Sequence, residues 1–510
     1  MSISNLRKNQ HLMWRAGFGP GLEDLKSLST ESPQSIWRKM LRDSGGTPAY
    51  IDVADNEVSS AYRGASLTPK QSADAMMNAG IVAGQKSSPN VVPGKKGQGP
   101  SETDRRRLAQ RSRENIKTLN LTWLDQMVTS KQQLREKISL FWHGHFATNS
   151  GNILHQQKLL DIIRVNALGS FGNLLKEVSK SASMINYLNN NQNRKNRPNE
   201  NFAREVMELF TMGHGSYSEK DIKEAARAFT GWGATPSGEF VFRPQQHDEN
   251  EKTFLGRKGN FKGDDILNIL LEQKETAYFI TGKIYRYFVN DKANEENIKV
   301  LADRFYSSGY DISKLLSNIF QSDWFFESEN IGNHIKSPVE LIVGIRRTFD
   351  PVIENKPSQL LLQRLLGQTL FYPPNVAGWP GGYNWIDSSS LMLRLQIPKL
   401  MFESGNVNLS PKDNDDQMMG MTDPLIEKIR QNRKAAAQVI QATINWKRYL
   451  EIFEKIKRDQ LTKHIADLML IPPMDNQQIL IGSLADAESR ESFIKSTAIQ
   501  LMCMPEYQLC

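Results

Sequence analysis

Signals for the start and end of helices recur along this chain of 510 residues, whereas runs that alternate between apolar and polar residues are few. Ser218–Asp221 and Ser337–Glu340 both have the spacing of a helix N-terminal capping box. Between such signals, apolar residues recur at helical spacing, including one long pattern over Arg105–Lys137. Only Glu239–Phe242 and Thr253–Leu255 read as strands, and we expect them to form a small hairpin. The sequence therefore predicts a mainly α, irregular multi-helix globular domain.

Composition indicates how the chain is organised. From about residue 45 to 102 it is rich in Ser, Pro, Gly, Ala and Lys, which predicts a long flexible insertion because structureless loops of this length are unusual in compact domains. The insertion would interrupt a main helical domain over residues 1–410. We expect residues 411–510 to form a C-terminal helical segment packed on that domain, with a first helix over Pro424–Gln441.

The net charge of +8 is concentrated in one stretch rather than spread over a binding face. Lys86–Arg113 holds eight basic and two acidic residues, so +6 of the net charge lies there. Since no aromatic residues are interleaved with the basic ones, the stretch is more typical of a solvated linker than of a surface for an anionic partner. We therefore expect no specific nucleic-acid partner.

Cysteine content and the N-terminus bear on the compartment. The two cysteines, Cys503 and Cys510, cannot build a disulfide framework or a cysteine metal site. No apolar segment follows the N-terminal charges, so the expected localisation is cytoplasmic. Export to the periplasm with a signal-bearing partner is the alternative. No window approaches ~18 uninterrupted apolar residues, so no transmembrane segment is expected.

Two histidines stand in an aromatic setting at Phe141–Phe146. In a helix, His143 and His145 would point ~200° apart and could not bind one ion, unless Gly144 breaks the helix. The alternative reading is one core histidine bonded to the backbone and one exposed histidine.

Two glutamates, Glu205 and Glu208, stand at i and i+3 on the next polar helix, so they share a face. Buried carboxylates need a shared cation, a shared proton or arginines. We predict that at least one of them is substantially buried and faces a histidine or arginine of another segment, with His145 the first candidate histidine. The alternative is that both are exposed or paired with Arg204 or Arg227.

A His247-Asp248 pair follows on a loop, where it suits metal binding or an orienting hydrogen bond, but also plain turn chemistry. Nitrogen and oxygen ligands of this kind suit zinc, iron or manganese. The predicted cofactor is a divalent metal of unknown identity, and its predicted ligands are His145, Glu205, Glu208 and His247. These four and Asp248 are the candidate catalytic residues.

The loop Gly367–Trp385 is rich in proline, glycine and aromatic residues. Asn375, Trp379 and Trp385, with Arg394 downstream, are its candidate binding residues, because the two tryptophans could form a platform for a sugar ring or a peptide. The alternative is that the aromatic residues pin a long loop to the core. The sequence holds no P-loop, no Rossmann fingerprint, and neither a G-x-S-x-G nor an H-E-x-x-H motif.

Several of these stretches together resemble a bacterial family known as domain of unknown function 1800. The similar stretches span nearly the whole chain in order: His11–Pro20, Phe141–Phe146, Asn201–Thr211, Phe229–Trp232, His247–Asp248, Lys336–Glu340, Gly367–Gly382 and Pro505–Gln508. The resemblance implies no established activity. Proteins that look like this are often encoded beside exported sulfatase-like or phosphatase-like proteins, which implies a partner of that kind.

Two functional hypotheses follow. In the first, the chain is a metal-assisted hydrolase or oxidoreductase with a histidine–carboxylate centre. In the second, it is a non-catalytic partner or scaffold for a neighbouring exported sulfatase-like or phosphatase-like protein. Whether His145, Glu205, Glu208 and His247 converge in space separates the two.

Overall fold

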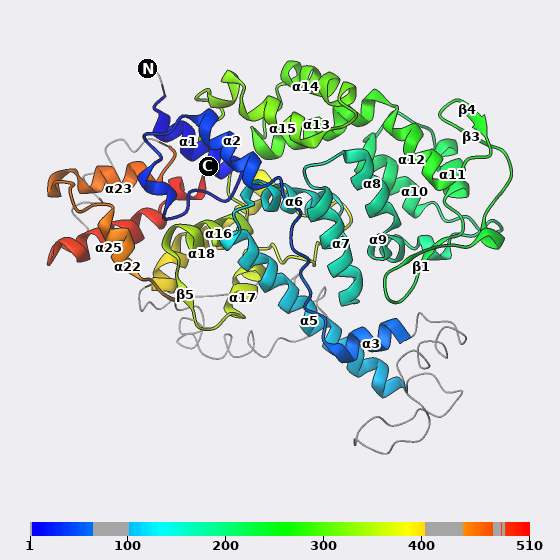
Figure 1. Ribbon diagram of the computed structural model, residues 1–510, viewed down its shortest axis with the longest axis horizontal. Coiled ribbons are helices and arrows are strands. Elements are labelled where there is room, and N and C mark those ends of the chain that lie inside the picture. The colour runs from blue at the N-terminus through cyan, green and yellow to red at the C-terminus, as the bar shows by residue number, and fades with distance from the viewer. Residues whose placement is uncertain (1–2, 65–100, 403–441, 473–480, 482–484) are drawn as a thin grey trace.

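Helices account for most of the chain, as the capping signals and the helical periodicity predict (Figure 1). The computed structural model describes residues 3–64, 101–402, 442–472, 481 and 485–510. Residues 65–100 of the predicted insertion, and the helix predicted over Pro424–Gln441, lie outside these ranges. The division of the chain at residue 410 stays a prediction.

The first half of the chain forms a run of helices that supplies the centre of the molecule and one of its ends (Figure 1). They are α1 (Asn5–Arg15), η1 (Asp24–Lys26), α2 (Pro33–Asp43), α3 (Asn56–Gly64), α5 (Glu102–Thr129), α6 (Gln133–His145), α7 (Ile153–Asn166), α8 (Phe171–Lys180), α9 (Ala182–Tyr187), η2 (Asn190–Gln192), α10 (Asn201–Glu205), η3 (Val206–Thr211) and α11 (Glu219–Ala228).

The second half begins with two short sheets and returns to the N-terminal helices, where α23 packs against α1. Its helices are η4 (Pro244–Gln246), α12 (Gly263–Leu271), α13 (Lys274–Phe288), α14 (Glu295–Ser307), α15 (Ile312–Phe320), η5 (Asp323–Phe326), α16 (Pro338–Phe349), α17 (Ser358–Leu365), η6 (Gly382–Trp385), α18 (Ser388–Phe402), α22 (Trp446–Glu451), η7 (Arg458–Gln460), α23 (Leu461–Met469), α25 (Arg490–Met502) and η8 (Pro505–Gln508).

Both predicted capping boxes are present. The side chains of Ser218 and Ser337 accept hydrogen bonds from the backbone N–H groups of Asp221 and Glu340, and these two carboxylates accept from the serine N–H groups in return. Proline occupies the first turn of α16, where its missing N–H has no helical partner to lose. The starts of α11 and α16 were thus readable from local sequence alone.

The strands pair differently from the predicted hairpin. In the structure, β2 (Phe240–Phe242) pairs with β1 (Trp232–Ala234), and β3 (Lys252–Phe254) pairs with β4 (Arg257–Gly259), all antiparallel. Leu255 and Gly256 both have positive φ, which makes a tight two-residue turn directly after β3 and returns the chain as β4. A third two-stranded sheet joins β5 (Val352–Ile353) to β6 (Ala442–Thr443).

The single helix predicted over Arg105–Lys137 is wrong, because the chain breaks between α5 and α6. Ser130 takes an extended backbone conformation at the end of α5. The side-chain amide of Gln133 then donates hydrogen bonds to the carbonyls of Met127 (2.9 Å) and Ser130 (2.7 Å). These bonds satisfy carbonyls that a helix end leaves without partners, which lets a new helix start within four residues.

Helix α6 is the central element of the core, and almost every side chain on it is buried. Its buried charges have specific partners: Glu136 pairs with Arg164 (2.6 Å), and Lys137 pairs with Glu340 of α16. Removing one member of a buried pair typically costs about 3–5 kcal/mol, so these pairs fix α6 against α7 and α16. None of the helices in the described part of the chain has the length and apolar character that crossing a membrane requires.

Candidate ligand-binding cavity

The two histidines at the end of α6 face different parts of the molecule. The helix continues through Gly144 to His145, so the glycine does not bring the imidazoles together. His143 Nε2 accepts a hydrogen bond from the backbone N–H of Phe371 (3.1 Å), whereas His145 Nε2 lies 3.4 Å from the carbonyl oxygen of Phe210. Both rings are buried, and burial lowers the pKa of His143 to about 3.

A π-helical turn, η3, positions the surroundings of His145. The N–H of Met212 bonds to the carbonyl of Met207, five residues earlier (2.9 Å), and such turns are frequent at functional sites. The carbonyls of Leu209 and Phe210 near its end accept from Lys283 Nζ (3.2 Å) and His145 Nε2 (3.4 Å). The π-turn therefore supplies backbone acceptors to two side chains of distant segments.

The hydrogen bonds of His145 determine which of its two ring nitrogens carries the proton. Since a carbonyl only accepts, the His145 proton is on Nε2, and Nδ1 accepts from Lys283 Nζ at 3.3 Å. Burial, and the positive charge of Lys283, hold the pKa of His145 well below its ordinary value, so the imidazole is neutral. Burial lowers the pKa of Lys283 to about 8.

Lys283 of α13 has no carboxylate partner within the described residues. Its neighbours are the neutral imidazole of His145, the carbonyl of Leu209 and the ring of Phe279, whose centroid is 4.9 Å from Nζ. Buried cations are normally paired or bound by a counter-charge. The amine is thus a largely desolvated cation that lacks an anionic partner in the described part of the chain.

The loop Gly367–Trp385 is held against α6 by close backbone contacts. Gly378 has a φ of +82°, and a Cβ there would lie 2.2 Å from the carbonyl oxygen of Gly144. Gly382 has a φ of +59°, and a Cβ there would lie 2.5 Å from Oδ2 of Asp291. The His143 ring packs against Trp379 at a centroid distance of 5.5 Å. Only glycine fits at both positions.

Between this loop, α6 and α13 lies a cavity of about 510 Å³, the size range of small-molecule sites. We call it the loop cavity. Trp379 and Trp385 line it, and Tyr383 lies at its rim with 81% of its surface exposed. The polar and charged side chains of its lining are His145, Lys283, Arg286, Asp291, His334, Ser337, Glu340, Gln368 and Asn384.

One carboxylate of the cavity wall, Glu340, is ionised and has its charge balanced by neighbouring protein groups. It contacts Lys137, lies 3.4 Å from His334 Nε2 and accepts the N–H of Ser337 (2.7 Å). Burial opposes ionisation of Glu340, but the charges of Lys137 and His334 and their hydrogen bonds hold its pKa well below the ordinary value. Glu340 is therefore a structural anion of the wall.

The two glutamates of the predicted centre, Glu205 and Glu208, lie on the same helical segment as Phe210, whose carbonyl contacts His145. Neither carboxylate bonds to His145. Glu208 is mostly buried, with 17% of its side chain exposed, and pairs with Arg204 (3.2 Å) one turn earlier; His214 Nδ1 is 3.7 Å away. Glu205 is half-buried, and burial together with the charge of Glu208 raises its pKa.

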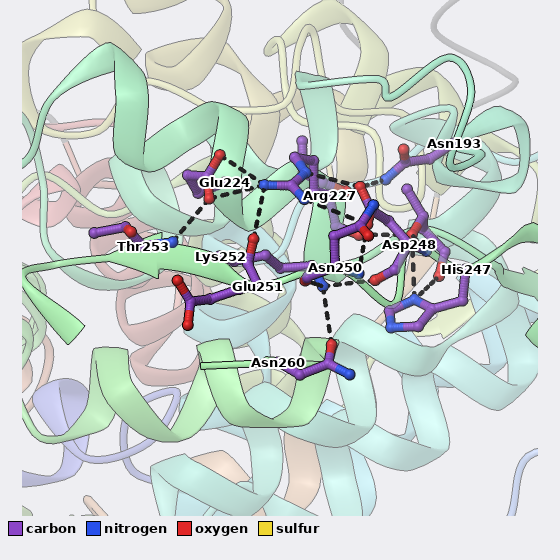
Figure 2. Close-up of polar contacts among 12 residues, drawn as sticks. Asn193, Glu224, Arg227, His247, Asp248, Asn250, Glu251, Lys252, Thr253 and Asn260 are labelled. Carbon is purple, nitrogen blue, oxygen red and sulfur yellow. Dashed lines mark hydrogen bonds and ion pairs between the residues drawn. The ribbon is translucent and has the colours of Figure 1, made fainter. Parts of the chain in front are cut away.

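His247 and Asp248 belong to a separate polar network around α11 and β3, shown in Figure 2. His247 donates from Nδ1 to the carbonyl of Thr230 (2.8 Å). Asp248 accepts from Arg227 (2.7 Å), and Arg227 also pairs with Glu224 (3.0 Å). Although burial opposes ionisation of Asp248, the Arg227 hydrogen bonds hold its pKa below the ordinary value. We call these residues the α11 network.

The remaining predicted residues divide between the loop and the core. Asn375 is exposed and shapes the loop, since its side chain accepts from the N–H of Ala377 (2.9 Å). Arg394 is fully buried away from the cavity lining and donates to the carbonyl of Lys336 (2.9 Å). Within the described ranges, no three histidine, cysteine, aspartate or glutamate side chains lie close enough together to hold a metal ion.

The sequence interpretation did not include Lys283, Arg286, Asp291 or His334. For Lys283 a signal exists, because it stands three residues after Ile280 and seven after Thr276, both of which are buried on α13. A lysine at such a position must be desolvated, so it merits a search for a counter-charge.

Comparison of the chain with known proteins shows the family to which it is similar. The chain matches the family described as "Protein of unknown function (DUF1800)" over residues 11–509, which confirms the resemblance drawn from the sequence. No curated protein and no solved structure matches the chain.

Proposed function

Since the chain belongs to the DUF1800 family, whose function is unknown, we propose one from its own geometry: the chain binds a small organic anion in the loop cavity. The observation that carries this proposal is Lys283, a largely desolvated ammonium at the cavity wall that has no carboxylate partner among the described residues. A bound carboxylate, sulfate or phosphate group would supply the missing charge, because charge-assisted hydrogen bonds to such groups are among the stronger polar contacts.

The charges behind the cavity wall support an anionic ligand. Lys137, Lys336 and Arg394 all interact electrostatically with Glu340. Lys137 and Arg394 therefore share one carboxylate, whereas burial lowers the pKa of Lys336 to about 7 and Lys336 also interacts with Cys510. The positive charge of Lys137 and Arg394 lies in a medium of low dielectric constant, where it acts over longer distances than in water. A negative ligand group entering the cavity would be attracted by this field.

The remaining surface of the cavity suits the body of an organic molecule. Phe141, Tyr287, Trp379 and Trp385 contribute aromatic surface to the lining. Burying apolar ligand area against such rings contributes roughly 25 cal/mol per Å². An inorganic anion alone would leave this surface unused.

The His145–Lys283 pair could also move a proton, because Nδ1 of His145 accepts the Lys283 hydrogen bond directly. A metal-assisted hydrolase or oxidoreductase built on His145, Glu205, Glu208 and His247 is the more specific version of the enzyme hypothesis. It would require these side chains to share an ion, and the contacts described above assign Glu208 and His247 to other partners. The proposal of anion binding does not depend on a metal.

Isothermal titration calorimetry with organic anions and their neutral isosteres tests the proposal. Benzoate and glucuronate against benzamide and glucose form a suitable set. We expect the wild type to bind an anion, and Lys283→Met to weaken binding by about tenfold or more, the loss of one charge-assisted contact. Lys39→Met, an exposed lysine outside this cavity, is the matched control. Equal affinity of Lys283→Met and wild type would reject the proposal.

Docking of a protein partner through the same loop is the second candidate function. Tyr383 favours it, because an aromatic ring that is 81% exposed is the kind of side chain that anchors interfaces. The partner would be the neighbouring exported sulfatase-like or phosphatase-like protein. Co-purification of that protein with wild type but not with Tyr383→Ala would support this function, and cell fractionation of the pair would show whether the complex is cytoplasmic or periplasmic.

A further inference from the structure

We propose that the organic anion is an acidic sugar, held with its charged group at Lys283 and its ring against the tryptophans of the loop cavity. This inference rests on the proposed anion binding and names the class of ligand. The shared chemistry is a hydroxylated ring with one negative group, either a carboxylate or a sulfate ester.

The first support is a set of hydrogen-bonding groups in the cavity that the protein leaves unused. Among the described residues, Arg286 makes no hydrogen bond or ion pair, and neither does the carboxylate of Asp291. Gln368 accepts the N–H of Val339 through Oε1 (2.9 Å), which leaves its Nε2 as a donor. Asn384 donates through Nδ2 to Gly381 (3.0 Å), which leaves Oδ1 as an acceptor.

These unused groups include both hydrogen-bond donors and acceptors. The presence of both kinds favours a polyhydroxylated ligand over a simple organic acid. A fatty or aromatic acid carries one anionic group and could not donate to Asp291 or Asn384. A polar group that loses its water without gaining a partner is unfavourable. A polyhydroxylated ring offers donors and acceptors around its edge, so it can satisfy both kinds of group at once.

The second support is the aromatic part of the lining. The indole N–H groups of Trp379 and Trp385 donate no hydrogen bond to any residue that the structure describes. Neither indole nitrogen is among the buried polar atoms that lack a partner, so both remain accessible. Both residues can therefore present ring surface and a donor to a ligand. The C–H groups of a sugar ring pack on aromatic rings, while its hydroxyls remain available to neighbouring polar groups.

The third support is the arrangement of charge along the cavity. Lys283 is largely buried, whereas Asp291 and Asn384 are exposed. A carboxylate or sulfate would therefore be favoured at the buried end and disfavoured next to Asp291. Gly144 and Gly381 add open space, since a Cβ at either would meet no atom within 4 Å. The cavity thus favours a ligand with its acid at one end and its hydroxyls at the other.

Calorimetry on the full chain with four ligand types tests the inference. The probes are glucuronate and galacturonate, glucose 6-sulfate, neutral glucose, and benzoate as an acid without hydroxyls. We expect at least one acidic sugar to bind about tenfold more tightly than both glucose and benzoate, as two additional polar contacts would give. The carboxylate and sulfate probes distinguish the two sources of charge.

Asp291→Asn separates the sugar inference from anion binding alone. Because an amide is a weaker acceptor than a carboxylate, this variant should lower the ratio of acidic-sugar to benzoate affinity several-fold, since the negative charge removed from Asp291 affects both anions alike. Asp459→Asn, an exposed position in η7, is the control. If benzoate binds as tightly as every acidic sugar, the sugar inference is wrong while anion binding stands. If no anion binds at all, both fail.

Discussion

The loop cavity and the α11 network each contain a buried histidine that bonds to a backbone carbonyl, yet their charges are arranged in opposite ways. In the α11 network, Arg227 is paired with both Asp248 and Glu224. In the loop cavity, the contacts that Lys283 makes with described residues are all to neutral groups. Residue types alone made both regions equal candidates for a site. Whether each buried charge has a protein partner is what distinguishes a structural network from a site that lacks its ligand.

The largest expected effect comes from removing an anion of the α11 network. Asp248→Ala leaves the guanidinium of Arg227 without one of its two carboxylates in a partly buried place, so we expect a loss of stability of about 3 kcal/mol. Urea denaturation measures it. Ligand binding in the loop cavity should be unchanged when the variant is folded. A loss below about 0.5 kcal/mol, typical of exposed pairs, would show that the network is not structural.

The next effect concerns the wall of the loop cavity. Gly378→Ala places a Cβ within 2.2 Å of the Gly144 carbonyl at a φ of +82°, so the loop must move or strain. We expect a cost of about 1–3 kcal/mol and, in contrast to Asp248→Ala, loss of anion binding. Gly151→Ala, outside the cavity lining and where a Cβ meets nothing within 4 Å, is the matched control. If the two variants had the same stability and the same anion affinity, the close packing of Gly378 against Gly144 would not matter for the cavity.

A smaller effect of opposite sign is expected at Lys283. Lys283→Met removes a desolvated charge that has no carboxylate partner, so at pH 7 and without ligand the variant should be about 1 kcal/mol more stable than wild type. Thermal denaturation at fixed pH measures the difference. A destabilisation comparable to that of Asp248→Ala would mean that Lys283 is a structural residue and that the two regions do not differ in kind.

The smallest effect is the pH dependence of that difference. The pKa of Lys283 is about 8 in the folded chain and about 10.4 in an unfolded one. Between these values the unfolded state binds more protons, so wild-type stability rises with pH through this window. His145 stays neutral throughout, because burial holds its pKa well below the ordinary value. The advantage of Lys283→Met should therefore be present at pH 7 and disappear towards pH 10.5. An advantage that is constant with pH would contradict the assignment.

Local sequence predicted what depends on local interactions. The capping boxes at Ser218 and Ser337 gave two helix starts. The i, i+2 spacing indicated that His143 and His145 point apart if the helix continues through Gly144, and it does. The strand pairing failed because the positive φ of Leu255, which makes the turn, is unusual for a leucine. The loop cavity was not predictable, because His145 and Lys283 are 138 residues apart and meet only through the packing of α6, α13 and η3.

Because η3 is a π-turn, the geometry of the cavity wall depends on the number of residues in this segment as well as on their identity. A π-turn fits one more residue into a helix than the α-helical hydrogen-bond pattern needs. Deleting one residue between Val206 and Thr211 would restore that pattern and rotate the following carbonyls by about 100° around the axis. Leu209 and Phe210 would then no longer present their oxygens to Lys283 and His145. An insertion or deletion here would thus abolish in one step an arrangement that many substitutions would leave in place.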